Sequence, residues 1–268
     1  MAITTLDGYI AGAKERINWV KTATRTTVAA GYFSLFDIAG SPGAGTLSAG
    51  NTANGVVHTD ATTGYRSIAA FGGGATGYVS AIDFTASVAC RFILFDRLFT
   101  CGAYAFNANT ALASQPSFLG RVPGGNAAGC ANNTELWAEA VTAFTGNQTW
   151  NVTYTNQAGT ASRTTGATGI GAAPTVGRCF RLPLQAGDTG VSLVTNVAGG
   201  TGTAGTANIN VLRRLVSGRC GAANFMDTLD MLRTGMRQIF ADSALYVLIA
   251  ADSTSSGAPD IDIEIVNG

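Results

Sequence analysis

The sequence predicts a mainly β protein, an antiparallel β sandwich or jelly roll with a short N-terminal helix. From about residue 17 onward, apolar and polar residues alternate with the period of two that half-buried strands show. Glycine occupies 35 of 268 positions, nearly twice the usual share of about 7%, which indicates many turns. Only 12% of the residues are charged. This is about half the usual share and favours a subunit whose surface is covered by neighbours.

The first residues predict an amphipathic helix. Thr4 stands three residues before Asp7, as in a capping box. The apolar residues recur at the spacing of one helix face, namely Leu6, Ile10, Ala13 and Ile17. Two glycines weaken this helix by about 1 kcal/mol each, so we expect it to need a partner surface. The chain is therefore divided into an N-terminal helical arm, residues 1–20, and a β-sandwich body, residues 21–268, which is either one domain or two halves meeting at a seam near residues 108–130.

Several strands follow from the alternation. Residues 82–94 predict one long core strand, and residues 136–141 and 150–154 predict a hairpin to which residues 161–165 add a third strand. A short helix is expected within Met226–Ile239. Further strands are expected at residues 178–184, 191–197, 209–216, 245–249 and 261–266.

The charge balance argues against two classes of partner. The net charge is +0 and the isoelectric point is near 6.5, so no long-range field attracts a nucleic acid or an anionic membrane. No stretch approaches the roughly 18 apolar residues of a membrane span. The first residues lack a basic, apolar leader, so we expect assembly in a cytoplasm.

Lysine and arginine are unevenly distributed along the chain. Lys14 and Lys21 are the only lysines, and every later cation is arginine. Arginine suits partly buried contacts and lysine is depleted from interfaces, although a compositional bias towards arginine is an equal alternative. We expect subunit contacts from eight residues, namely Leu6, Ile10, Lys14, Arg16, Arg213, Arg214, Arg233 and Arg237.

The cysteines contain no zinc or redox motif. They are five in number and widely spaced: Cys90, Cys101, Cys130, Cys179 and Cys220. We expect reduced thiols, with Cys90 and Cys179 in the core, although loops could bring two of the other three together.

No catalytic constellation is recognisable. His58 is the single histidine, and a solvated loop histidine is favoured over an acid–base pair with Asp60. Neither a nucleophile elbow nor a phosphate-binding glycine loop is present. We therefore predict no enzyme activity, no catalytic residue and no cofactor.

The last predicted strand carries three carboxylates on one face, those of Asp260, Asp262 and Glu264. Three carboxylates could bind a hard cation such as calcium. A charged, water-facing strand edge explains them better, because their spacing matches no calcium loop. They remain a weak candidate for a metal site.

Scattered segments resemble virion structural proteins of tailed bacteriophages, a group without a diagnostic motif. The resemblance lies in residues 29–36, 43–55, 151–157 and 233–236. It implies a particle component that is assembled in the host bacterial cytoplasm. We expect a capsid decoration or cement protein that binds the major capsid protein and copies of itself, with a trimer favoured. The alternative is a tail or baseplate component that engages the host receptor.

Overall fold

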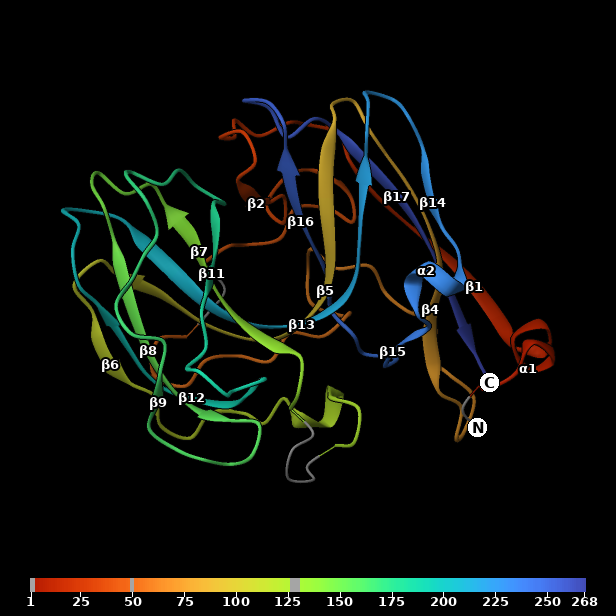
Figure 1. Ribbon diagram of the computed structural model, residues 1–268, viewed down its shortest axis with the longest axis horizontal. Coiled ribbons are helices and arrows are strands. Elements are labelled where there is room, and N and C mark those ends of the chain that lie inside the picture. Colours follow the sequence, from red (N-terminus) through yellow and green to blue (C-terminus); the bar gives the residue numbers. More distant parts are fainter. Residues whose placement is uncertain (1–2, 49–50, 126–130) are drawn as a thin grey trace. The chain divides into compact units, whose positions relative to one another are not determined.

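The computed structural model describes residues 3–48, 51–125 and 131–268, and it is mainly antiparallel β (Figure 1). The chain forms two compact units. The first, called unit 1, comprises Met1–Gly45, Thr59–Asp96 and Leu215–Gly268. The second, called unit 2, comprises Thr46–His58 and Arg97–Arg214. Unit 2 is therefore formed by two insertions in the sequence of unit 1.

Unit 1 contains two short helices, α1 (Leu6–Ala11) and α2 (Met231–Thr234), and strands of two sheets. The six-stranded sheet has the order β14 (Asp227–Leu229), β4 (Gly77–Ala86), β17 (Pro259–Asn267), β1 (Ala13–Lys21) and β3 (Gly40–Ser41), with β15 (Arg237–Ile239) also paired to β4. The second sheet contributes β2 (Tyr32–Ser34), β16 (Leu245–Ala251), residues 90–96 of β5 (Cys90–Ala105) and residues 215–220 of β13 (Thr206–Cys220).

The core of unit 1 lies between these two layers. Ile261, Ile263 and Ile265 of β17 point inward and are at most 1% exposed, while the residues between them point outward. Phe84 of β4 meets Phe92 of β5 with ring centroids 4.3 Å apart. Each such buried side chain contributes about 1.5–3 kcal/mol, so alternation along the strands fixes which face is inside.

One edge of the six-stranded sheet is interrupted. β14 and β15 both pair with β4, and α2 lies between them in sequence. Asp230 caps α2, since its Oδ1 accepts hydrogen bonds from the backbone N–H groups of Leu232 and Arg233. Gly235 ends the helix with a φ of 62°, a conformation that glycine adopts without strain. The edge is thus two three-residue strands and a helical turn.

Unit 2 is a second pair of layers. One contains β10 (Thr168–Gly169), β8 (Thr149–Asn156), β12 (Val191–Gly199) and β6 (Asn109–Ala111), with β9 (Arg163–Thr164) paired to β8. The other contains β11 (Cys179–Leu182), β7 (Thr134–Thr142) and the remaining parts of β13 and β5. A short 3-10 helix, η1, spans Leu119–Arg121. Fully buried Trp150 and Tyr154 of β8 fill the core with the valines of β12.

The predicted fold class is confirmed, but the N-terminal boundary is wrong. Thr5, and not Thr4, caps α1, and the helix ends at Ala11. Ala13 and Ile17 lie in β1, which pairs with β17 over eight residue pairs. A side chain at position 12 would place its Cβ 2.7 Å from Val266 Cγ2, so Gly12 permits the close crossing from helix to strand. Residues 13–20 are therefore part of a sheet and not of an arm.

Two expectations about the strands are also wrong. Residues 82–94 form the end of β4 and the start of β5, because the chain reverses at 87–89 to bring both strands to one core. β7 and β8 lie in different sheets and are not a hairpin, although β9 does pair with β8. The short helix expected within Met226–Ile239 is present as α2. The expected seam near 108–130 lies inside unit 2, and its residues 126–130 are outside the described residues.

Candidate functional site

Helix α1 is short but fixed at both ends. Thr5 Oγ1 accepts a hydrogen bond of 3.1 Å from Gly8 N. At the other end, Lys14 Nζ donates to Tyr9 O at 2.8 Å and to Ile10 O at 3.2 Å, satisfying carbonyls that a helix end leaves open. Six residues would not remain helical alone in water. Its persistence therefore depends on these caps and on contacts to the sheet below.

The main contact to the sheet is a hydrogen bond from Tyr9 Oη to Glu264 Oε1, 2.9 Å long. Glu264 points outward from β17 and also accepts from Ser80 Oγ at 2.9 Å and from Arg16 Nη2 at 3.3 Å. Arg16 Nη1 reaches Asp83 Oδ2 at 3.2 Å. A continuous set of polar contacts therefore runs from α1 across β1 and β17 to β4.

These contacts shift the pKa values of Tyr9 and Glu264 in opposite directions. The hydrogen bond to Glu264 raises the pKa of Tyr9, and burial and the charge of Glu264 raise it further. Burial alone would raise the pKa of Glu264, but hydrogen bonds from Ser80 and Tyr9 and the charge of Arg16 lower it overall. At neutral pH the tyrosine is therefore a neutral donor and the glutamate a charged acceptor, which strengthens the bond.

The same outward face continues to α2. Thr228 Oγ1 donates to Asp83 Oδ1 at 2.8 Å. Arg233 binds Asp227 with both guanidinium nitrogens, at 2.8 and 3.2 Å, and donates to Thr228 O at 2.6 Å. This fork geometry gives the arginine one fixed orientation. We call the outward side of β14, β4, β17 and β1, with α1 and α2, the outer face of unit 1.

Large apolar side chains are exposed on these elements. Leu6 and Ile10 of α1 are 62% and 65% exposed, and Leu232 of α2 is 85% exposed. Phe225 and Met226, in the segment before β14, are exposed by 62% and 59%. Elsewhere in the described residues, large exposed apolar side chains are only Val28 and Leu193. Apolar anchors together with fixed arginines are typical of protein-binding surfaces.

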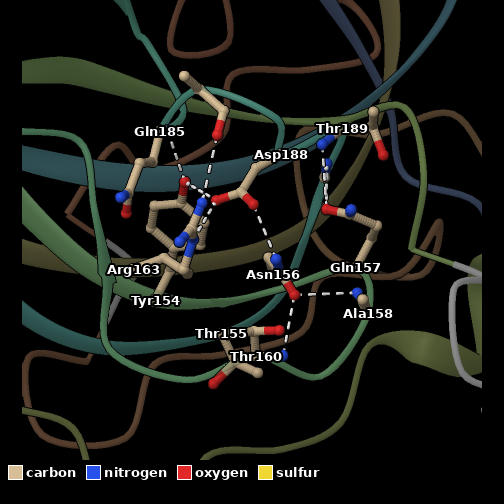
Figure 2. A network of polar contacts seen from close by, with 12 residues as sticks. Tyr154, Thr155, Asn156, Gln157, Ala158, Thr160, Arg163, Gln185, Asp188 and Thr189 are labelled. Carbon is tan, nitrogen blue, oxygen red and sulfur yellow. Dashed lines mark hydrogen bonds and ion pairs between the residues drawn. The ribbon is translucent and has the colours of Figure 1, made fainter.

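A separate polar cluster in unit 2 surrounds Asp188 (Figure 2). Its carboxylate accepts hydrogen bonds from Tyr154 Oη and Asn156 Nδ2, each at 2.7 Å, and from Arg163 Nε at 2.9 Å. Gln157 Oε1 accepts from the backbone N–H groups of Thr189 and Gly190. The cluster binds the turn after β8 to the loop before β12. Its oxygens are occupied by these donors, so its role is to fix the two loops.

His58 belongs to a buried part of unit 2 and is not the solvated loop residue that the sequence suggested. It is 3% exposed, and burial, with the charges of Arg97 and Arg121, lowers its pKa to about 2. Asp60 Oδ2 accepts hydrogen bonds from Ser67 Oγ and Ile68 N. His58 is therefore neutral at physiological pH.

Arg97 is the centre of this buried region. Its Nη2 lies 3.2 Å from Glu139 Oε2 and 2.9 Å from Asn210 Oδ1, and its Nε donates to Thr100 Oγ1 at 2.7 Å. The side chains of Arg97 and Glu139 are 1% and 0% exposed. A charge pair this deeply buried persists only with such additional hydrogen bonds.

The three carboxylates of β17 do lie on one face, but their geometry does not suit a cation. Neighbours on that face are two residues apart, about 7 Å along a strand, whereas calcium ligands lie about 2.4 Å from the ion. Asp260 Oδ1 accepts from Asn18 Nδ2 at 2.7 Å, and Glu264 is bound as described above. Within the described part of the chain, no three His, Cys, Asp or Glu residues gather as metal ligands.

The residues expected at interfaces are not all brought together. Leu6, Ile10, Lys14, Arg16, Arg233 and Arg237 belong to unit 1, whereas Arg213 and Arg214 belong to unit 2. Arg213 is only 5% exposed, so its side chain has almost no surface for a partner. Arg214 is 40% exposed and lies 3.2 Å from Glu135. Both lysines have structural roles, since Lys14 caps α1 and Lys21 is 1% exposed.

The exposed side chains near α2 were not predicted from the sequence. Met226 and Leu232 both lie in the segment Met226–Ile239, where a short helix was expected. Asp230 is a helix-capping residue and Gly235 a helix-ending one, and together they limit the helix to Met231–Thr234. Those two signals could have shown that the short helix begins at Met231 and ends before Gly235.

No protein-family model matches the chain, and no curated protein matches it. Solved structures of infectious bursal disease virus show a faint similarity. For the Gt strain the identity is 9%, over 94% of this chain and 81% of that chain, with a TM-score of 0.18. For the VP2 subviral particle it is 8%, over 95% and 40%, with a TM-score of 0.14. Scores this low carry no argument, so function must be argued from the residues.

Within residues 3–48, 51–125 and 131–268, no helix is long and apolar enough to span a membrane.

Proposed function

We propose that this protein is a structural component of a virus particle, a capsid decoration or cement protein of the tailed-bacteriophage kind that its sequence segments resemble. Its partners are the major capsid protein and neighbouring copies of itself. Binding uses the outer face of unit 1, and the activity is adhesion without turnover. The scarcity of lysine and the low share of charged residues fit a surface that assembly covers.

One observation carries the proposal: α1 presents Leu6 and Ile10 to solvent while the rest of the helix is tied down. A loose apolar segment would lose conformational entropy on binding, about 0.5–1.5 kcal/mol for each ordered side chain. Here Thr5, Lys14 and the Tyr9–Glu264 bond already hold the helix. Two exposed apolar anchors on a fixed support are therefore suited to insertion into a pocket of a partner.

The test uses particles that lack this protein and the purified full chain. The variant Leu6→Asp/Ile10→Asp places two charges on α1 and removes no buried contact, so it should fold. We expect its affinity for particles to fall at least tenfold, measured by cosedimentation. Leu193→Asp is the matched control, because Leu193 is an exposed apolar residue, 37% exposed, in unit 2. Unchanged binding of the α1 variant would overturn the proposal.

The number of copies per particle separates the decoration role from the alternative, a tail or baseplate component that engages a host receptor. Quantitative mass spectrometry against the major capsid protein gives this number directly. Hundreds of copies support decoration, whereas a handful would replace it with the tail role.

A further inference from the structure

Two buried cysteines of unit 1 lie at the ends of neighbouring strands. Cys90 is the first residue of β5, and Cys220 is the last residue of β13. β5 and β13 are adjacent in their sheet. Both side chains are 2% exposed, and both thiols are free. Because the strands run in opposite directions, the start of one lies beside the end of the other.

The register of the two strands places these cysteines opposite each other. Near the ends, the ring of Phe92 lies against Gly218, where an added Cβ would be 2.6 Å from Phe92 Cε1. Further along the same strands, Thr100 Oγ1 donates to Asn210 Oδ1 at 2.8 Å. Phe92 and Thr100 are eight residues apart on β5, and Asn210 and Gly218 are eight residues apart on β13. Both pairs therefore fit one antiparallel register. Cys90 lies two residues before Phe92, and Cys220 lies two residues after Gly218. The same register therefore places Cys90 opposite Cys220.

Opposite residues of antiparallel strands also share a face. Cys90, Phe92 and Leu94 belong to the same buried core cluster as Val216 and Cys220. Directly opposed residues have Cα atoms about 4.5–5.5 Å apart. A disulfide requires a Cα separation of about 4.4–6.8 Å. The backbone therefore allows a bond between these two sulfur atoms without a change of fold.

We propose that Cys90 and Cys220 are a site of reversible oxidation, at which a cross-strand disulfide forms when the protein meets a low-molecular-weight disulfide such as oxidised glutathione. One thiolate attacks the oxidant and releases one glutathione. The second thiolate then attacks the mixed disulfide and releases another. Two thiols are oxidised, the disulfide of the oxidant is reduced, and the two protons pass to the two glutathione molecules.

The reduced site resists rapid reaction. Burial, with smaller contributions from Cys220 and Asp252, raises the pKa of Cys90 to about 12, so little thiolate is present at neutral pH. Cys220 Sγ lies 2.7 Å from Ala222 O and 2.9 Å from Phe225 O, and oxidation replaces these contacts. Residues 221–226 above Cys220 are exposed, so opening this segment gives an oxidant access.

The bond would close a long segment of chain. All of Arg97–Arg214, the larger part of unit 2, lies between the two cysteines in sequence. Closing a long loop reduces the entropy of the unfolded chain more than closing a short one. The oxidised protein should thus be the more stable form. This inference does not depend on the proposed function, because it rests on the pairing of β5 with β13 and uses no residue of the outer face of unit 1.

The experiment refolds the fully reduced full-length chain in a glutathione redox buffer at pH 8, so that burial does not limit the reaction. Free thiols are then alkylated and the protein is digested with trypsin. Each cysteine falls in a different peptide, with Cys90 in residues 67–91 and Cys220 in residues 220–233. We expect these two peptides to be linked until a reductant is added. We also expect oxidation to raise Tm by roughly 10 °C.

Two variants complete the test. Cys90→Ala should lose the linked peptide and the dependence of Tm on the redox state. Cys179→Ala, which removes a buried cysteine of unit 2, should retain both. Alkylated Cys90 and Cys220 in the refolded wild-type protein, or a linkage to another cysteine instead, would overturn the proposal.

Discussion

Tyr9 Oη and Glu264 Oε1, 255 residues apart in sequence, are joined by a hydrogen bond of 2.9 Å that ties α1 to the outward side of β17. The bond explains how a six-residue helix stays ordered while its apolar side chains remain in solvent.

Tyr9→Phe should loosen α1 without unfolding unit 1. A hydrogen bond to a charged group contributes about 1.5–3 kcal/mol, and here the loss should be concentrated in the helix. We expect faster hydrogen exchange at Tyr9 N and Gly12 N, which donate within α1, and weaker particle binding. Ser80→Ala is the control, because Ser80 donates to the same carboxylate from β4. Equal exchange rates in wild type and Tyr9→Phe would show that other contacts hold the helix.

Removing Glu139 should destabilise unit 2 strongly. Glu139→Ala leaves the buried guanidinium of Arg97 without its charged partner, which costs about 3–5 kcal/mol in the free energy of unfolding. Arg181→Ala removes a surface ion pair with Glu135, in which Arg181 is 60% exposed, and should cost less than about 1 kcal/mol. Urea denaturation measures both. Similar losses in the two variants would contradict the assigned importance of burial.

Asp188 should contribute stability that is lost in acid. Burial would raise its pKa, but hydrogen bonds from Arg163, Asn156 and Tyr154 lower it below its usual value of 3.8. Because the folded-state pKa is the lower one, the contribution is complete above about pH 4 and disappears as the pH falls through the folded-state value.

Asp188→Asn should therefore be less stable than wild type at pH 7, and the difference should shrink below pH 4. Chemical denaturation at pH 7, 4 and 3 measures this. Asp7→Asn, a change at an exposed residue, should leave the wild-type acid profile intact. A stability difference for Asp188→Asn that is the same at every pH would refute the ionic role of this carboxylate.

Lys21 should destabilise the folded state as long as its side chain is protonated. Burial lowers its pKa to about 8, and the charge of Asp37 opposes this only partly. The unfolded chain has a lysine pKa of about 10.4, so between pH 8 and 10.4 the unfolded state binds more protons. Stability due to this group therefore rises with pH. Wild type should gain about 1–2 kcal/mol relative to Lys21→Met between pH 7.5 and 9.5.

Cysteine and tyrosine ionisation is common to both proteins and cancels in that comparison. Lys14→Met removes the only other lysine and serves as the control, since it should show no such gain relative to wild type. A pH-independent difference between wild type and Lys21→Met would mean that Lys21 stays protonated throughout.

The β class and most strands could be predicted because alternation is a local property. Ile261, Ile263 and Ile265 are buried and the residues between them face outward, as their spacing indicates. The strand conformation of residues 13–20 could not be predicted in this way. Their local spacing fits a helix, but pairing with β17, more than 200 residues away, overrides it.

The outer face was predicted only in part. Leu6, Ile10 and Arg16 were recognised from the helix pattern and the cation bias, and they lie on or beside α1. The hydrogen bond between Tyr9 and Glu264 depends on how β17 lies beside β1, which no short-range pattern contains. The burial of His58 was not predicted because its polar neighbours in sequence suggested solvent, whereas the fold buries it within range of the charges of Arg97 and Arg121.

The interrupted edge of β14, α2 and β15 limits how copies of this protein can associate. A long, regular edge strand offers a row of N–H and C=O groups to which another chain can add, and repeated addition leads to fibres. Here only three-residue strands are offered, and Arg233 occupies the carbonyl of Thr228. Lateral growth of the sheet is discouraged at this edge. At high concentration the protein would thereby avoid polymerising through this edge.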